Sequence, residues 1–226
     1  MSIDVLNVLL AESRALSAVL HTLTPGDLAR PTNCPPWDLQ ELVVHTAASI
    51  WVGDTPFPAA EPDAKLHDAA DYYRRPERDT TAYRQDNVDR TQQLAQRVLA
   101  TTSAADWFDE VLTKTVDVLG GQRLDGVVDV AGRGAMKLSD WLLTRIFSVA
   151  AHGLDVAITL GRDPWTTPEA LQAVRPIFVA LLDGEPPSGL GWDDQTFLAV
   201  ASGRRALTDH ERVLLGPHAR RFPLIS

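Results

Sequence analysis

Residues 140–161, DWLLTRIFSVAAHGLDVAITLG, decide the fold. We predict one long helix over this stretch, capped by Ser139 and closed by Gly161, because serine and glycine are favoured at these two helix ends. His152 lies on one face of this helix, and Asp155 follows about one turn later. The helix therefore combines core-forming residues with candidate functional side chains.

A second helix is predicted within residues 34–51, CPPWDLQELVVHTAASIW. Asp38 and Glu41 have the spacing of a capping box, which marks the start of a helix. His45 lies at the edge of the apolar stripe that follows, formed by Leu39, Leu42, Val43, Thr46, Ala47 and Ile50. Two histidines on two amphipathic helices are what a metal site inside a helical bundle is built from.

Helical signals dominate the rest of the chain. We predict a first helix that ends before Pro25 and Gly26. Further helices are expected in residues 66–74, 80–101, 104–119, 167–182, 197–201 and 208–216. Residues 53–63 and 124–137 are expected to be loops, the second with a short extended piece at 127–130. The chain is predicted to be all-α: a four-helix bundle in residues 1–162 and a short helical C-terminal extension, residues 163–226, packed on the same domain.

One face of the predicted helix at 80–101 changes character along its length. Its second half is apolar, but the same face continues upstream through Arg90, Asn87 and Tyr83. A polar inward face is typical of a cavity wall, so we predict these three residues to bind substrate. The alternative is that this end of the helix emerges into solvent.

Composition narrows the possible partners. The chain has 226 residues and a formal net charge of -9, with 21 basic and 30 acidic residues. This charge disfavours nucleic acid and anionic membranes. Cys34 is the single cysteine, so no intrachain disulfide is possible. We see no signal peptide and no apolar run near the roughly 20 residues of a membrane span. We expect a cytoplasmic monomer or homodimer with a small-molecule substrate.

The residues alone leave the nature of the histidine site open. His45 and His152 could hold a metal, with Asp155 as a further ligand or as the group that orients a histidine. Equally, both histidines could be held by hydrogen bonds inside the bundle. Arg145, on the same face as His152, needs an acidic partner such as Asp155, a surface carboxylate, or an anionic ligand. Cys34 precedes a helix start, which favours a thiolate, but it also fits a small core residue.

Several well-known motifs are missing from the sequence. It contains no GxGxxG or GxxxxGK[ST] loop, no GxSxG elbow, no HExxH and no CxxC. Neither a nucleotide-binding fold nor a hydrolase of these types is therefore indicated.

Three segments together resemble the mycothiol-dependent maleylpyruvate isomerase family, which has a DinB-like four-helix-bundle fold. Residues 34–45, CPPWDLQELVVH, resemble its second helix. Arg145 and residues 152–157, HGLDVA, resemble its fourth helix, whose usual pattern is R-x-x-E-x-x-x-H-x-x-D. Residues 201–205, ASGRR, and the tail at 222–224 are similar to the C-terminal extension of many members.

The resemblance implies a divalent metal, typically zinc, held by His45, by His152 and by a glutamate one turn before His152. In this chain the glutamate position is Ser148. A serine hydroxyl is a poor replacement for an anionic ligand, and two histidines alone bind metal weakly. The resemblance therefore predicts the fold of this chain better than it predicts the activity.

The function implied by the resemblance is that of a mycothiol-dependent isomerase or S-transferase. A metal-activated thiolate would add to an unsaturated organic acid or another electrophile. We predict His152, Asp155 and Arg145 to be catalytic, and Ser148 to join Arg90, Asn87 and Tyr83 in binding substrate. The alternatives are a metal-free isomerase or cyclase in the same cavity, and a non-catalytic binder of a small ligand.

Overall fold

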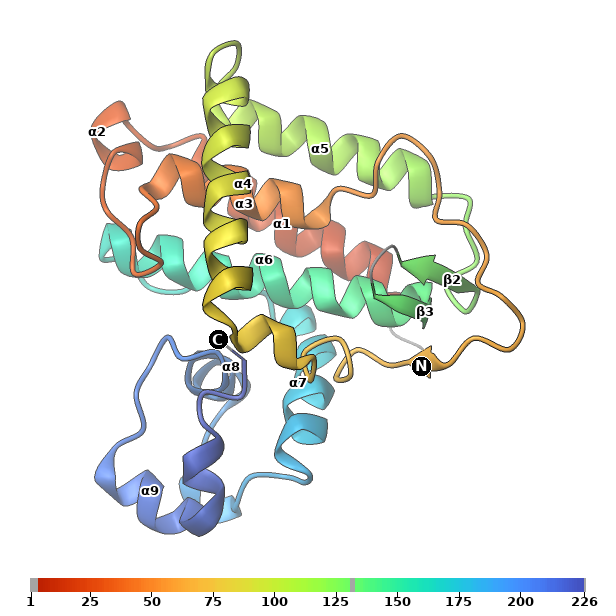
Figure 1. Ribbon diagram of the computed structural model, residues 1–226. Coiled ribbons are helices and arrows are strands. Elements are labelled where there is room, and N and C mark those ends of the chain that lie inside the picture. The colour runs from red at the N-terminus through yellow and green to blue at the C-terminus, as the bar shows by residue number, and fades with distance from the viewer. Residues whose placement is uncertain (1–3, 131–132, 226) are drawn as a thin grey trace.

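The computed structural model describes residues 4–130 and 133–225, and Figure 1 shows a predominantly helical molecule with a small sheet at one end of the bundle. The all-α prediction is thereby confirmed. The long helices before the C-terminal extension are α1 (Val5–Leu20), α3 (Leu39–Ile50), α4 (Thr81–Leu99), α5 (Ala104–Leu119) and α6 (Leu138–Leu160). The C-terminal helices are α7 (Pro168–Leu182), α8 (Asp194–Ala201) and α9 (Asp209–Leu215). Four short turns of helix are α2 (Pro25–Leu28), η1 (Pro76–Asp79), η2 (Ser188–Leu190) and η3 (Gly216–Arg221).

The bundle consists of α1, α3, α5 and α6, and α4 crosses it over α3 (Figure 1). α3 packs against both α5 and α6, while α1 packs against the other sides of these two helices. This arrangement buries the apolar stripe of each helix, which is the main source of the bundle's stability. Residues 1–3 of the predicted first helix lie outside the described range.

Local signals placed several helix ends correctly. Asp38 and Glu41 form the predicted capping box, in which the Asp38 side chain accepts a hydrogen bond from the Glu41 N–H. Gly161 closes α6 with a left-handed φ of 66°. Thr167 caps α7, and Thr208 with Glu211 caps α9. Pro25, expected only to end the first helix, also begins α2.

The cap predicted for α6 at Ser139 is wrong. The helix begins at Leu138, with Lys137 at the cap position and no side-chain cap hydrogen bond. The reason is that α6 follows directly from strand β3 (Gly134–Lys137), so pairing in the sheet sets where the helix starts. The Ser139 backbone N–H instead donates to the carbonyl of Leu124.

The helix predicted at residues 66–74 is also wrong, because this segment begins with a strand of a small sheet. β1 (Leu66–His67) pairs in parallel with β3, and β2 (Val127–Val130) pairs with β3 in antiparallel, giving the order β1-β3-β2. The extended piece predicted at 127–130 is confirmed as β2, whereas β3 was expected to be loop. Residues after β1 form turns that bury Ala69, Ala70 and Tyr72 against the core.

The C-terminal helices share a continuous core with the bundle. Phe147 of α6, Phe178 of α7 and Phe197 of α8 stack edge to face, with ring centroids 5.6 and 5.4 Å apart. The buried Glu12 of α1 accepts hydrogen bonds from the backbone N–H and the hydroxyl of Thr167 at the start of α7. The division at residue 162 stays a prediction.

α6 is the one described helix that is long and apolar enough to span a membrane by length and composition, contrary to the expectation from sequence. However, 72% of its apolar window is buried inside the molecule, as in the core helix of a soluble protein.

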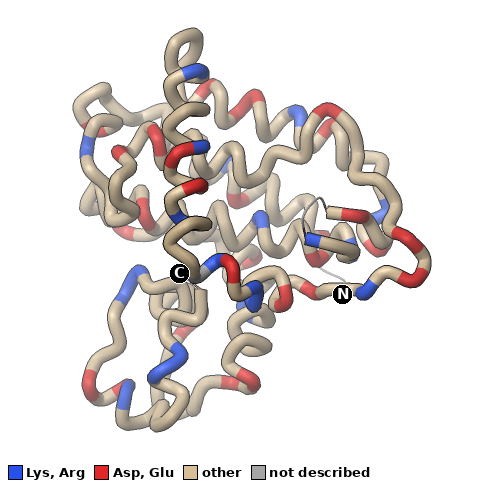
Figure 2. Tube along the Cα trace, viewed as in Figure 1, with Lys and Arg blue, Asp and Glu red and all other residues tan. Residues whose placement is uncertain are grey.

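Acidic and basic residues are interspersed over the trace (Figure 2). The cytoplasmic location stays a prediction.

The stacked phenylalanines provide a test of the shared core. Because Phe178 is 1% exposed and contacts a ring on each side, Phe178→Ala is expected to lower the free energy of unfolding by about 3–5 kcal/mol. Chemical denaturation followed by circular dichroism measures this change. Val213→Ala, at a side chain that is 78% exposed, is the control and should change stability by less than about 0.5 kcal/mol. Equal effects of the two substitutions would contradict the shared core.

Candidate functional site

The candidate site is centred on Asp155 of α6, whose side chain is fully buried. His152, one turn earlier on the same helix, places its Nδ1 2.9 Å from Oδ2 of Asp155. Arg204, which follows α8, donates from Nε and Nη2 to the two carboxylate oxygens at 2.9 and 2.7 Å. This two-pronged ion pair joins the C-terminal extension to α6 at the position of the histidine.

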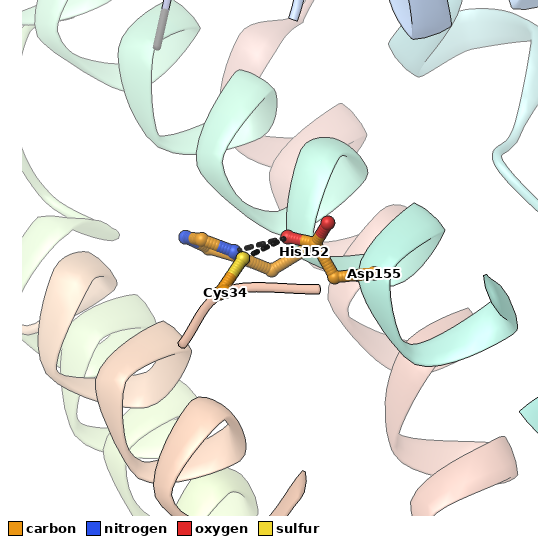
Figure 3. A group of neighbouring side chains, drawn as sticks. All are labelled: Cys34, His152 and Asp155. Carbon is orange, nitrogen blue, oxygen red and sulfur yellow. Dashed lines mark hydrogen bonds and ion pairs between the residues drawn. The ribbon is translucent and has the colours of Figure 1, made fainter. Parts of the chain in front are cut away.

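The loop before α3 completes the surroundings of this carboxylate. The side-chain amide of Asn33 donates to Oδ1 of Asp155 at 2.8 Å, and the Cys34 thiol donates to Oδ2 at 3.3 Å. Figure 3 shows Cys34 and His152 converging on Asp155 from the loop and from α6. The carboxylate therefore accepts hydrogen bonds from three separate parts of the chain.

Asp155 is ionised in this environment. Burial by itself would raise its pKa, but the hydrogen bond from His152 and the positive charge of Arg204 outweigh burial and hold the pKa below its ordinary value. An ionised carboxylate only accepts hydrogen bonds, so Nδ1 of His152 carries the proton of this contact. Asp155 thus selects the tautomer of His152 and leaves Nε2 as the nitrogen available to a ligand.

Cys34 does not form the thiolate that its place before a helix favours. Burial and then the negative charge of Asp155 raise the pKa of Cys34 to about 12. The thiol is half-buried and donates a hydrogen bond, so it belongs to the support of Asp155. This outcome agrees with the alternative interpretation of Cys34 as a small packing residue.

His45 lies beside His152, as the two-helix pattern predicted. Their ring centroids are 5.0 Å apart with the ring planes nearly perpendicular. Trp37 stacks on the other side of His45 at 4.5 Å, and Nδ1 of His45 is hydrogen-bonded to the Thr91 hydroxyl at 3.2 Å. Burial, followed by the charges of His152 and Arg145, lowers the pKa of His45 well below its ordinary value, so its imidazole is neutral.

Ser148 lies between Arg145 and His152 along α6. Its hydroxyl donates to the hydroxyl of Ser49 on α3 at 2.9 Å. The backbone carbonyl of Ser49 in turn accepts a hydrogen bond of 2.7 Å from Nη1 of Arg145. These contacts tie the middle of α6 to the end of α3 without placing a carboxylate there.

Arg145 is buried without the acidic partner expected from sequence. Asp155 pairs with Arg204, and among the described residues no carboxylate pairs with Arg145. Its guanidinium instead lies 5.0 Å from the ring centre of Tyr72 and 5.3 Å from that of Trp141. The predicted salt bridge of Arg145 to Asp155 or a surface carboxylate is therefore wrong, and its predicted catalytic role stays a prediction.

α4 turns a different set of residues inward than the sequence indicated. Thr91 is buried and meets His45, whereas Arg90 is exposed and pairs with Asp86 at 2.8 Å. Asn87 and Tyr83 are half-buried. Thr91 therefore faces the bundle at the place where Arg90 was expected to do so. The substrate-binding roles predicted for Arg90, Asn87, Tyr83 and Ser148 stay predictions.

Two residues of the site, Arg204 and Asn33, were not predicted from the sequence. Arg204 lies 49 positions from Asp155 and Asn33 lies 122 positions away, so no local spacing relates either of them to Asp155. The only signal was the position of Arg204 inside the ASGRR segment of the C-terminal extension.

The donor atoms do not reproduce the three-ligand metal set implied by the resemblance. Ser148 is neutral and is bound to Ser49. A different group, Cys34, His152 and Asp155, has ligand atoms within 4.8 Å of one another. In that group the charge of Asp155 is already paired with Arg204, and Nδ1 of His152 is used in the contact with Asp155. The arrangement fits a hydrogen-bond network better than a zinc site.

The fold and the site together define a DinB-like helical bundle in which two histidines from facing helices meet. The family model described as the mycothiol maleylpyruvate isomerase N-terminal domain matches residues 9–157, and the chain belongs to this family. The match contains His45, Ser148, His152 and Asp155, and ends before Arg204. Comparisons with curated proteins and with solved structures gave no significant match.

The ion pair of Asp155 provides a test of the site's architecture. Asp155→Asn leaves Arg204 buried without its counter-charge, and we expect a loss of about 3–5 kcal/mol in the free energy of unfolding near pH 7. Because the folded-state pKa of Asp155 is lowered, this contribution is present above the unfolded pKa of about 3.9 and disappears as the pH falls through the folded-state value. Denaturation at a series of pH values measures both effects.

A matched control is Asp125→Asn, which removes the carboxylate of the exposed pair between Asp125 and Arg123. This substitution should leave the denaturation midpoint almost unchanged, because exposed pairs contribute little. If both variants behaved alike, Asp155 would not be the buried partner of Arg204.

The environment of Cys34 predicts a slow thiol. With a pKa of about 12, its thiolate fraction at pH 8 is on the order of a thousandfold below that of an ordinary cysteine. Reaction of the folded protein with a disulfide reagent should therefore be slow and should become fast on denaturation. A reaction rate that levels off near pH 8.5 in the folded protein would contradict the assignment.

Proposed function

We propose that the chain is a small-molecule enzyme of the thiol-dependent isomerase or S-transferase type, with His152 as its acid–base group. The observation that carries this proposal is the chain of contacts from Arg204 to Asp155 to His152. It fixes the imidazole, and among the described residues no hydrogen bond engages its Nε2, which lies on the ring beside His45. A histidine oriented by a buried carboxylate is the standard arrangement for moving a proton near neutral pH.

Each residue of this chain has a separate role in the proposal. Asp155 holds the tautomer and stabilises the imidazolium that forms when Nε2 takes up a proton. Arg204 is a positioning residue, because it fixes Asp155 and touches no reacting atom. His45 is neutral, and its Nε2 can hydrogen-bond a polar atom of the substrate.

The proposed reaction begins with transfer of the thiol proton to Nε2 of His152. The thiolate forms a C–S bond with one alkene carbon of an unsaturated organic acid, and the electron pair of the double bond moves to the conjugated carbonyl. Rotation about the new single bond follows, the electron pair returns, the C–S bond breaks and the thiolate regains its proton from His152. When the thiol stays attached, His152 instead gives its proton to the carbon next to the carbonyl, the product is a saturated thioether and the reaction is an S-transfer.

The thiol in this proposal is mycothiol, which the description of the family names. Zinc at His45 and His152 stays a prediction from the resemblance, since Ser148 supplies no anionic third ligand. The lack of that ligand favours a second candidate, a metal-free isomerase or cyclase that uses the same His152 without a thiol. A non-catalytic binder would use the same histidines to hold a ligand without turnover.

The first experiment measures turnover of maleylpyruvate, with and without mycothiol, by protein purified without a metal-affinity tag. We expect thiol-dependent activity that falls at least about a hundredfold in kcat/KM for His152→Ala, the size of a typical acid–base contribution. His210→Ala, at an exposed histidine, is the matched control and should behave as the wild type.

Elemental mass spectrometry on the same samples separates the alternatives. About one equivalent of zinc, lost in His45→Ala, would overturn the acid–base role of His152 in favour of a metal site. Activity that needs no thiol would support the isomerase or cyclase candidate. Ligand-induced thermal stabilisation without turnover would identify a binder.

A further inference from the structure

A cavity lies away from the histidines, where the segment after β1 meets β3 and η1. Its volume is about 300 Å³, at the lower end of the range for small-molecule sites. Five of its described lining residues are lysine, histidine or arginine: Lys65, His67, Arg74, Arg75 and Arg133. Among the described lining residues the one carboxylate is that of Asp71, which is paired with Arg74 at 3.2 Å.

Tyr72 forms one wall of this cavity, and four guanidinium groups surround its ring. The distances from the guanidinium carbons to the ring centre are 4.9 Å for Arg75, 5.0 Å for Arg145, 5.3 Å for Arg133 and 5.7 Å for Arg78. These arginines come from three separate parts of the chain: the segment around η1, the turn before β3, and α6. The tertiary structure therefore concentrates positive charge here although the whole chain is acidic.

Few acidic groups balance this charge. Arg75 pairs with the half-exposed Glu77 at 3.4 Å, while its buried Nη2 has no hydrogen-bond partner among the described residues. Among the residues that the structure describes, no carboxylate pairs with Arg78 or Arg145. Partly buried guanidinium groups such as those of Arg78 and Arg145 are costly when no carboxylate is close, and a bound anion would lower this cost.

The hydroxyl of Tyr72 reports the strength of this positive field. Arg133 donates from Nε to the Tyr72 hydroxyl at 3.1 Å. Burial alone would raise the pKa of Tyr72, but the charges of Arg145, Arg133 and Arg78 outweigh burial and lower it to about 7. The neighbouring Tyr73, whose ring packs edge to face on Tyr72, has its pKa raised by burial and stays protonated.

We propose that this cavity binds a small oxyanion, a carboxylate or phosphate group of a small molecule, held by Arg75 and Arg133 against Tyr72. The planar fork of a guanidinium matches two oxygens of either group, which makes arginine the preferred residue for such ligands. Arg145 precedes His152 by 152 − 145 = 7 positions on α6. The cluster therefore lies roughly 10 Å along the helix axis from the histidine site, and it does not depend on thiol chemistry.

The test is calorimetric titration of the whole chain with inorganic phosphate and, separately, with malonate, at constant ionic strength maintained with sodium chloride. We expect saturable binding of at least one of the two anions, and the tighter one identifies the chemical source. Arg75→Gln and Arg133→Gln are each expected to weaken it at least about tenfold, the loss of one charge-assisted contact. Arg123→Gln, at an exposed arginine paired with Asp125, is the matched control and should bind as the wild type does.

A second measurement keeps the proposal independent of any loss of folding in the variants. The difference in tyrosinate absorbance between the wild type and Tyr72→Phe measures the titration of Tyr72. The titratable and charged groups that face its ring are Arg75, Arg78, Arg133, Arg145 and Tyr73. A bound anion offsets the arginine charges, so saturating ligand should raise the midpoint from about 7 towards the ordinary value near 10. By linkage, anion binding should weaken as the pH rises above 7 in the wild type and should lose this dependence in Tyr72→Phe.

Two results would overturn the proposal. One is the absence of saturable heat with either anion up to about 10 mM, a concentration that would detect even weak binding. The other is binding that Arg75→Gln and Arg133→Gln leave as strong as Arg123→Gln does. In either case the Tyr72 phenolate is itself the counter-charge of the arginines, and its midpoint stays near 7 whether or not an anion is added.

Discussion

The burial of one ionised carboxylate, Asp155, constrains the structure around it. A buried charge is costly unless it is paired and fully hydrogen-bonded. Asp155 meets this requirement with donors from His152, from Arg204 and from the loop at Asn33 and Cys34. Satisfying one side chain therefore requires α6, the loop before α3 and the segment after α8 to meet at one point. The C-terminal extension is thereby a structural part of the site, since the carboxylate would lack its counter-charge without it.

The same pairing determines what chemistry the site can support. The family pattern that this chain resembles implies a metal whose binding depends on an anionic ligand one turn before the second histidine. Ser148 stands at that position and bonds to Ser49. Asp155 is not a free replacement, because Arg204 already takes up its charge. The bundle and the paired histidines are retained, while the donor set around Asp155 forms a hydrogen-bond network. A fold can be kept while its site changes in this way, because packing of the helices depends on apolar residues that the site does not use.

α6 connects two regions of different character. Its C-terminal half carries the histidine and the carboxylate, and its N-terminal half carries Arg145 beside Tyr72 and Trp141. Between them, Ser148 and Arg145 both bond to Ser49 at the end of α3. These hydrogen bonds hold the part of α6 between the histidine site and the arginine cluster around Tyr72 against α3. The two regions differ because negative charge is buried at one and positive charge is collected at the other.

The sequence by itself determined the helices, many of their ends and the meeting of His45 with His152. The helices and their ends follow from local signals, namely apolar spacing, capping residues such as Asp38 with Glu41, and a terminal glycine at Gly161. The meeting of the two histidines was expected from the pattern of a helical-bundle site and from the family resemblance. Only the tertiary structure decided the sheet, the start of α6, the choice of Thr91 over Arg90 as the inward residue and the partners of Asp155 and Arg145. Each of these depends on groups far apart in the chain, such as the pairing of β1 with β3 or of Arg204 with Asp155. Local spacing carries no information about such contacts, because they form only when the packed bundle brings distant segments together.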